Sequence, residues 1–251
     1  MPTSATTASL LLLLLLSANV QARVFQSDSG DCRIIGIPME MQSGRGFCAP
    51  ATMVRVLKYY GIQADQAQLA KQADCTNDTG TDVETMLGIV ARTCSDYKLG
   101  VETIIGFDYE RYLKIIEEYN RLALQENSPR LWYSGGGSLD LSKTFLKANI
   151  GILRRTAKPK DLRRFSATIQ KHIDANTPLI WGLVLGIVPE PDMLPNTQGG
   201  HLRLIIGYND ETKQVIYSDP WGPNHATKRM KLADAYAITM SLHALTPAQS
   251  H

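Results

Sequence analysis

Apolar residues recur at helical spacing in the first two thirds of the chain. The clearest case is residues 49–60, in which Met53, Val54 and Leu57 fall on one face and Gly61 follows the segment. Apolar positions three and four apart are typical of a helix with one buried face, and a glycine after the last turn is typical of its end. Further helices are predicted over residues 65–73, 81–93, 108–126 and 161–174.

The second half of the chain carries strand patterns. Residues 179–185 are almost continuously apolar, which is typical of a buried strand. Residues 201–208 and 215–219 are two strand-like runs separated by a polar turn, and this arrangement predicts a hairpin. A last sheet segment is expected near residues 237–242. Helices followed by strands favour an α+β fold, with one domain over residues 23–251.

A long loop lies between two of the predicted strands. Residues 186–200 show no regular apolar pattern and end directly before His201. Long loops without secondary structure in compact domains are often functional. We expect this loop to form part of a substrate groove or a lid, with a plain surface connection as the alternative.

The N-terminal segment has the form of an export signal. Residues 10–16 are all leucine, a run too short to cross a bilayer, and the small residues Val20 and Ala22 suit signal peptidase. We therefore expect residues 1–22 to be a signal peptide that is cleaved after Ala22, and the mature protein to be secreted or periplasmic. A buried or anchoring N-terminal helix is the alternative, because no lysine or arginine precedes the leucines.

Composition excludes several classes of partner. The 251 residues include 26 basic and 24 acidic side chains, which gives a net charge of +2. A chain with so little excess charge lacks the positive field that gathers phosphate backbones, so nucleic acid is not an expected partner. No stretch after the leucine run has the length and apolarity of a membrane span, so stable membrane insertion is not expected either.

The four cysteines stand in different surroundings. Cys48 directly precedes the predicted helix over residues 49–60 and follows an irregular Gly-Arg-Gly segment. The positive end of a helix dipole favours thiolate over thiol and lowers the thiol pKa. Cys48 is therefore a candidate nucleophile, with a half-cystine or an inert buried thiol as the alternative. Cys75 and Cys94 flank a predicted helix, and we expect them to form a disulfide in an oxidising compartment, which leaves Cys32 free or intermolecular.

A candidate base and its orienting acid lie in the predicted hairpin. His201 opens the first strand and Asp219 ends the second. The register depends on whether Tyr208 pairs with Lys213 or with Gln214. The pairing with Gln214 puts Asp219 on the same sheet face as His201, one diagonal step away and within reach of the imidazole, because side chains alternate along a strand.

Asp210 is the competing acid, nine residues after His201 in the turn of the hairpin. At the usual rise of a strand, this separation is about 25 to 30 Å. We therefore expect Asp219, rather than Asp210, to orient His201. A cysteine at a helix start with a histidine and an aspartate is the set of groups needed for nucleophilic catalysis.

These residues resemble those of a known family. Gln42, five residues and then Cys48 at a helix start, together with His201 at a strand start and Asp219-Pro220 at the end of the next strand, are similar to the papain-like cysteine peptidases of the bacteriocin-processing, double-glycine leader type. The similarity is greatest to stand-alone, secreted members of that group, and in outline it runs over residues 35–222.

The resemblance implies a fold and a role for each residue. It implies a papain-like fold, in which a helical lobe carrying the nucleophile helix packs on an antiparallel sheet carrying the histidine and aspartate. It implies Cys48 as nucleophile, His201 as general base, Asp219 as its orienting group and Gln42 as an oxyanion-hole donor. A structural reading of each residue taken singly, such as a core histidine or a surface glutamine, remains the alternative. We also expect a substrate groove lined by Gly46, Phe47, Gly200 and Trp221.

The expected activity is hydrolysis of peptide or amide bonds through an acyl-enzyme on Cys48. The partner is then a peptide or protein substrate, and no metal or organic cofactor is expected, because the cysteines and histidines lack zinc-binding spacing. Two alternatives share the same residues: a catalytically idle papain-like module that binds a peptide or protein in the groove, and an enzyme that transfers the acyl group rather than hydrolysing it. The sequence does not indicate an oligomeric state.

Overall fold

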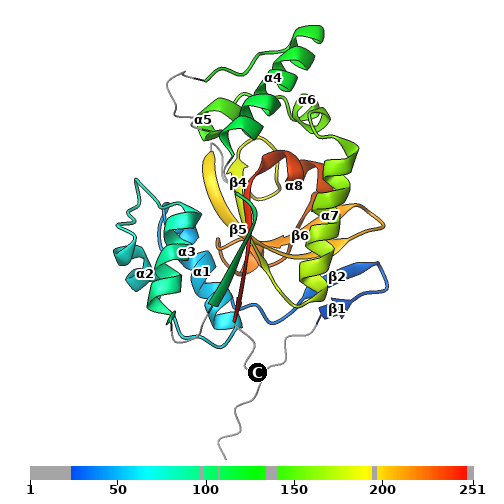
Figure 1. Ribbon diagram of the computed structural model, residues 1–251. Helices are drawn as coiled ribbons and strands as arrows, with labels where there is room; N and C mark the ends of the chain where they lie inside the picture. Colours follow the sequence, from blue (N-terminus) through cyan, green and yellow to red (C-terminus); the bar gives the residue numbers. More distant parts are fainter. Residues whose placement is uncertain (1–23, 96–98, 107, 134–140, 194–196, 248–251) are drawn as a thin grey trace, which may run out of the picture.

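An antiparallel sheet forms the centre of the molecule (Figure 1). The structure is a computed structural model that describes residues 24–95, 99–106, 108–133, 141–193 and 197–247, so the expected signal peptide lies outside the described residues. The strand order is β1-β2-β5-β4-β8-β3, and β6 extends the sheet by pairing with β5 and with β7. The strands are β1 (Val24–Gln26), β2 (Asp31–Ile34), β3 (Leu99–Ile105), β4 (Leu179–Leu185), β5 (Gly199–Asn209), β6 (Gln214–Ser218), β7 (Lys228–Lys231) and β8 (Thr239–Pro247).

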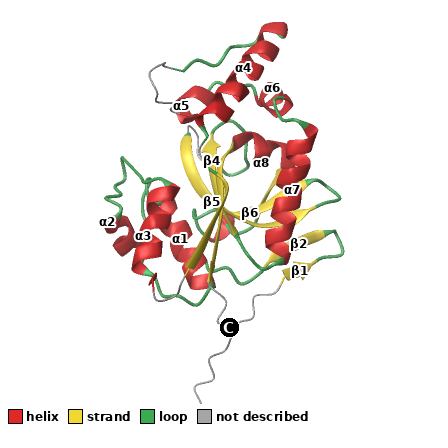
Figure 2. Cartoon of the chain, in the orientation of Figure 1, coloured by secondary structure: helices red, strands yellow, loops and turns green. Residues whose placement is uncertain are grey.

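Helices cover the sheet in two groups, as Figure 2 shows. The first group forms a lobe beside β5 and consists of α1 (Cys48–Tyr59), α2 (Gln66–Gln72) and α3 (Val83–Thr93). The second group is α4 (Tyr109–Gln125), α5 (Leu141–Phe145), α6 (Ile150–Arg155), α7 (Pro159–Asp174) and α8 (Leu232–Ile238). Every helix within the described ranges falls short of the length and apolarity that a membrane span requires.

The position of strand β4 at the centre of the sheet explains why its sequence is apolar at nearly every position. All of its residues are buried. Ile180 belongs to the apolar cluster under α1 and α3, whereas Trp181 and Leu183 belong to the cluster under α4 and α7. A strand covered on both faces buries both sets of alternating side chains, so it reads as a continuous apolar run.

The five predicted helices are present, with ends that match the local sequence. Helix α1 ends at Tyr59 with Tyr60 as its C-cap, and Gly61 follows with a φ of +76°, a conformation that glycine adopts without steric cost. Helix α3 is capped by Asp82, whose carboxylate accepts a hydrogen bond from the Thr85 backbone N–H at 2.7 Å. The α+β class and the helical lobe are therefore confirmed.

Several elements differ from the prediction. The segment expected as a strand near residues 237–242 is the end of α8 followed by the start of β8. Strands β1, β2, β3 and β7 have no counterpart in the prediction. All residues of β3 are at least partly exposed, and a strand without a buried face lacks the apolar alternation that makes strands visible in a sequence.

The hairpin forms, but its register changes along its length. At the turn, Tyr208 pairs with Val215, so both expected partners, Lys213 and Gln214, are wrong. An irregularity between Ile205 and Gly207 then shifts the register by one residue. Beyond this β-bulge Leu204 pairs with Ser218, which is the register that brings Asp219 to the face of His201.

Candidate active site

Helix α1 presents Cys48 at its first turn. The N–H of Ala51 donates to the Phe47 carbonyl at 3.1 Å, so Cys48 is the first helical residue. The helix packs on β5, where the Thr52 hydroxyl donates to the Leu202 carbonyl at 3.2 Å. The thiol is half-buried at the junction of the helical lobe and the sheet.

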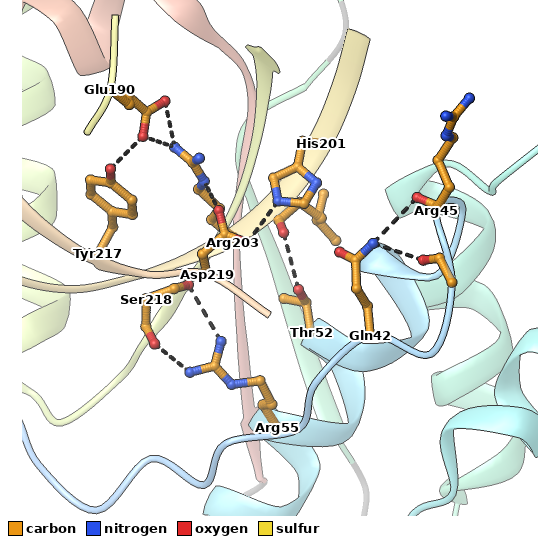
Figure 3. Close-up of polar contacts among 12 residues, drawn as sticks. Gln42, Arg45, Thr52, Arg55, Glu190, His201, Arg203, Tyr217, Ser218 and Asp219 are labelled. Atoms are coloured by element: carbon orange, nitrogen blue, oxygen red, sulfur yellow. Dashed lines mark hydrogen bonds and ion pairs between the residues drawn. The ribbon is translucent and has the colours of Figure 1, made fainter. Parts of the chain in front are cut away.

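His201 and Asp219 form a buried pair beside this helix. The Nε2 atom of His201 lies 2.9 Å from Oδ1 of Asp219, and both side chains are almost fully buried (Figure 3). The imidazole also lies close enough to Cys48 to lower the pKa of its thiol. Three groups far apart in the sequence are therefore brought together in the order cysteine, histidine, aspartate.

The protonation of the site follows from these contacts. Burial lowers the pKa of His201, but the charge and the hydrogen bond of Asp219 outweigh it and raise this pKa to about 9. Burial raises the pKa of Cys48, but the interaction with His201 outweighs it, and the net shift of this pKa is downward. The pair thus shifts the site toward thiolate and imidazolium, the state in which a cysteine is nucleophilic.

Asp219 is held by a second partner. Its pKa is raised by burial but lowered overall by the positive charges of His201 and Arg203. Nε of Arg203 donates to Oδ2 of Asp219, while Oδ1 faces the imidazole. The carboxylate is therefore ionised and fixed on both oxygens.

Asp210 lies at the other end of the hairpin, as expected. Its Oδ1 accepts hydrogen bonds from Lys213 Nζ at 2.8 Å and from Gln170 Nε2 at 3.2 Å. More than half of its side chain is exposed. Neither of these contacts involves the His201 imidazole.

Gln42 lies in the loop before α1, and its side-chain amide points back along that loop. Nε2 donates to the Gly44 carbonyl at 2.7 Å and makes a longer contact of 3.4 Å with the Arg45 carbonyl. Its backbone N–H donates to the Pro220 carbonyl at 2.8 Å, which ties the loop to the segment after Asp219. Gln42 Oε1 is buried and, among the described atoms, has no hydrogen-bond partner.

The four residues expected to line a groove surround the site in different ways. A Cβ on Gly46 would lie 2.0 Å from the Thr76 carbonyl, so only glycine allows this close approach, whereas a Cβ on Gly200 would meet nothing within 4 Å. The Trp221 ring lies 4.9 Å from the His201 ring, centroid to centroid. Phe47 is partly buried directly before Cys48. Gly200 thus leaves open space next to the histidine, and Trp221 covers one side of it.

The expected disulfide is wrong: Cys75 and Cys94 are both free. The Cys75 thiol donates to the Gly46 carbonyl at 3.3 Å, and Cys94 packs in the apolar cluster of the helical lobe. Burial raises the pKa of both thiols. Two cysteines that flank a helix in the sequence are thus turned toward different surroundings. Cys32 is also a buried free thiol.

A group of charged residues around the site was not predicted from the sequence. Arg203 contacts Asp219 and Glu190, and Arg55 of α1 donates to the Ser218 carbonyl at 3.4 Å and to its hydroxyl. Both arginines are only 1% exposed. A signal was present in the sequence, because each arginine interrupts an apolar run at a position that the helix or strand pattern buries. Within the described ranges, no set of three or more His, Cys, Asp and Glu side chains is arranged to hold a metal ion.

The family model that matches this chain is the Peptidase_C39 like family, over residues 34–127 and 142–242. The chain belongs to this family. It is thus a cysteine-type peptidase with a papain-like fold, and the expectations of family, fold and enzyme class are confirmed. No protein with a curated description shows a significant match.

Solved structures with low sequence identity also match. The peptidase domain of Streptococcus ComA, a bi-functional ABC transporter involved in quorum sensing, is 14% identical with a TM-score of 0.42, covering 85% of this chain and 100% of that domain. Xylellain, a cysteine protease from Xylella fastidiosa, is 12% identical with a TM-score of 0.47, covering 92% of this chain and 94% of that one. A double glycine motif protease from an AMS/PCAT transporter, in complex with its leader peptide, is 13% identical with a TM-score of 0.42, covering 85% and 93%.

Proposed function

We propose that this chain hydrolyses peptide bonds with Cys48 as nucleophile, His201 as general acid and base, and Asp219 as the orienting group. The observation that carries the proposal is the buried contact of 2.9 Å between His201 Nε2 and Asp219 Oδ1, with the same imidazole close enough to Cys48 to lower the pKa of its thiol. A nucleophile, a base within reach and a third group that fixes the base are the requirements of covalent acyl transfer.

In this proposal the reaction runs in two steps. The Cys48 thiolate attacks the carbonyl carbon of the substrate, and the tetrahedral intermediate collapses to a thioester while the His201 imidazolium gives its proton to the departing amine. The neutral imidazole then takes a proton from water, which attacks the thioester. Collapse of the second intermediate releases the carboxylic acid and restores the thiolate and imidazolium.

Two donors are proposed for the oxyanion that forms in each step. The Cys48 backbone N–H is one, since the first N–H groups of a helix have no partner within the helix. Gln42 is the other. Its Nε2 makes one close contact, of 2.7 Å with the Gly44 carbonyl, and a longer one of 3.4 Å with the Arg45 carbonyl, so the proposal requires the amide to rotate toward the oxyanion when substrate binds.

The proposed substrate is a peptide or protein outside the cytoplasm. The leucine run and the small residues before Arg23 support export, and the open space at Gly200 leaves room for an extended chain beside His201. Mass spectrometry of the mature native protein should find Arg23 at its N-terminus. Retention of Met1 to Ala22 would contradict export through this signal.

An activity-based probe tests the catalytic proposal. A peptide carrying a thiol-reactive electrophile is expected to label Cys48 of the wild-type protein and to leave Cys48→Ala unlabelled. Incubation with a peptide library, followed by mass spectrometry, should then show products with new free carboxylates that are absent with Cys48→Ala.

The products also distinguish the alternatives. Ligated peptides without free acids would indicate acyl transfer rather than hydrolysis. Tight binding of library peptides without any product, together with slow probe labelling, would contradict the proposal and indicate a binding module.

A further inference from the structure

The ionic contacts around the site continue beyond Asp219 into the core. Arg203 donates from Nε to Asp219 Oδ2, and its Nη1 lies 3.0 and 2.9 Å from the two carboxylate oxygens of Glu190 (Figure 3). The side chains of Arg203 and Asp219 are 1% exposed and that of Glu190 is 6% exposed. Both carboxylates are therefore held by the same guanidinium, out of contact with solvent.

The guanidinium of Arg203 has little freedom to move. Its Cζ atom lies over the Tyr217 ring, 4.7 Å from the ring centroid, and over the Trp221 ring, 5.5 Å from that centroid. The Tyr217 hydroxyl in turn donates to Glu190. A planar guanidinium held by two carboxylates and two rings has one orientation, and this orientation fixes the oxygen of Asp219 that it contacts.

The loop that carries Glu190 is also fixed. Lys228 Nζ donates to the Pro191 carbonyl at 2.9 Å and lies 3.1 Å from Asp192 Oδ2. Glu190 to Asp192 thus form an anchored part of the loop between β4 and β5, rather than a free lid. The anchor places a second buried carboxylate behind the histidine and aspartate.

The charges around the histidine balance. They come from helix α1, the loop before β5, strand β5 and the segment at the end of β6. In the thiolate and imidazolium state the cations are His201, Arg203 and Arg55, and the anions are Cys48, Asp219 and Glu190. Two further titratable groups face the site as neutral species, Tyr217 and Cys75, because burial raises the pKa of each. Removal of Glu190 would leave one positive charge in excess, and an uncompensated buried charge is costly.

We propose that Arg203 and Glu190 are a positioning pair: together they fix the Asp219 carboxylate against His201 and keep the charge of the buried site balanced. The proposal rests on the triad proposed above. Neither residue contacts the substrate in it, because both act through Asp219.

The test is the pH at which Cys48 becomes reactive. Alkylation by iodoacetamide is followed by mass spectrometry of the tryptic peptide of residues 46–55, which contains Cys48 as its only cysteine. Glu190→Gln leaves excess positive charge, which favours the thiolate, so the midpoint of reactivity should move to lower pH by at least about 0.5 unit. Arg203→Gln leaves excess negative charge, so the midpoint should move to higher pH by a similar amount. The double variant should return to within about 0.3 unit of the wild type.

Asp192→Asn is the matched control. It removes the same charge from the same loop, but its side chain is 77% exposed, so its midpoint should stay at the wild-type value. A purely structural role for Glu190 and Arg203 predicts loss of folding without shifts of opposite sign.

This alkylation test needs no peptide substrate, so it is independent of the proposed reaction. If Glu190→Gln, folded as judged by its thermal unfolding, keeps the wild-type midpoint, the positioning proposal is wrong. This holds even if Arg203→Gln does not fold. If the shifts occur but no peptide is cleaved, the positioning pair stands and the proposed peptidase reaction fails.

Discussion

The two ends of the β5–β6 hairpin carry acid–base contacts that differ in burial. At one end, Asp219 lies between His201 and Arg203, and its side chain is 1% exposed. At the other end, Asp210 pairs with Lys213, and their side chains are 56% and 65% exposed. The same two strands therefore hold one ion pair inside the protein and another in solvent.

This difference makes the buried end the better candidate for catalysis. At the buried end, low solvent access strengthens each interaction, which raises the pKa of His201 and lowers that of Asp219. At the exposed end, water screens the charges, and such pairs contribute little. Perturbed titration in a buried cluster is a feature of functional sites.

Replacement of the proposed nucleophile should have the largest effect. Cys48→Ser keeps the size of the side chain but removes the thiolate, so peptide turnover should fall by at least about 10³-fold. Cys32→Ser is the control, because that thiol contacts Asp174 at 3.4 Å, away from the proposed triad, and turnover should be unchanged. Equal turnover in wild type and Cys48→Ser would exclude Cys48 as the nucleophile.

The two aspartates of the hairpin provide the direct comparison. Asp219→Ala should lower turnover at least about tenfold, which corresponds to about 1.4 kcal/mol of barrier, because His201 loses the group that orients it. Asp210→Ala should leave turnover nearly unchanged. Asp219→Asn, which keeps the shape of the side chain, covers the case in which the alanine variant does not fold. Full turnover with Asp219→Ala and loss with Asp210→Ala would reverse the assignment of the triad.

The buried end of the hairpin should make stability depend on pH. A histidine with a raised pKa contributes stability that is complete below its unfolded pKa of 6.5 and is lost as the pH rises through its folded pKa of about 9. In Cys48→Ala, which removes the opposing titration of the thiol, the free energy of unfolding should therefore fall over this range by about 1 to 3 kcal/mol. Denaturant unfolding at several pH values measures it. The additional substitution His201→Gln should remove the part of this fall that the imidazole causes, and Asp210→Asn should leave it in place.

Removal of the exposed pair should have the smallest effect. Lys213→Ala should change the free energy of unfolding by less than about 0.5 kcal/mol, since exposed pairs are screened by water. Chemical denaturation is sufficient to measure this change. A loss of more than about 2 kcal/mol would show that the exposed end of the hairpin is not the weak contact described above.

The fold could be predicted from the sequence wherever one face of an element is buried. Helix α1 has its apolar residues at helical spacing and Gly61 at its end, and β4 is apolar throughout because both of its faces are covered. Strand β3 could not be predicted, because its residues are mostly exposed and carry no alternation. The prediction of a disulfide was wrong for a related reason: spacing in the sequence does not determine which way Cys75 and Cys94 point.

The proposed site could be predicted in part. Cys48, His201 and Asp219 were found from the start of a helix and the two ends of a hairpin, and the structure brings them together. The predicted register at the turn was wrong, and only the irregularity between Ile205 and Gly207 restores the alignment at Asp219. Side-chain contacts such as that of Glu190 with Arg203 depend on the path of a long loop, which no periodicity encodes.

The pH dependence of Cys48 alkylation, compared between wild type and His201→Ala, tests the central claim most directly. Because the His201 imidazolium lowers the pKa of the Cys48 thiol, wild-type Cys48 should react rapidly at about pH 6, well below the pKa of about 8.5 of a free thiol. In His201→Ala, Cys48 should react only as the pH approaches the pKa of a free thiol. A wild-type Cys48 that titrates as an ordinary thiol, with no change on removal of the imidazole, would contradict the proposed thiolate–imidazolium pair.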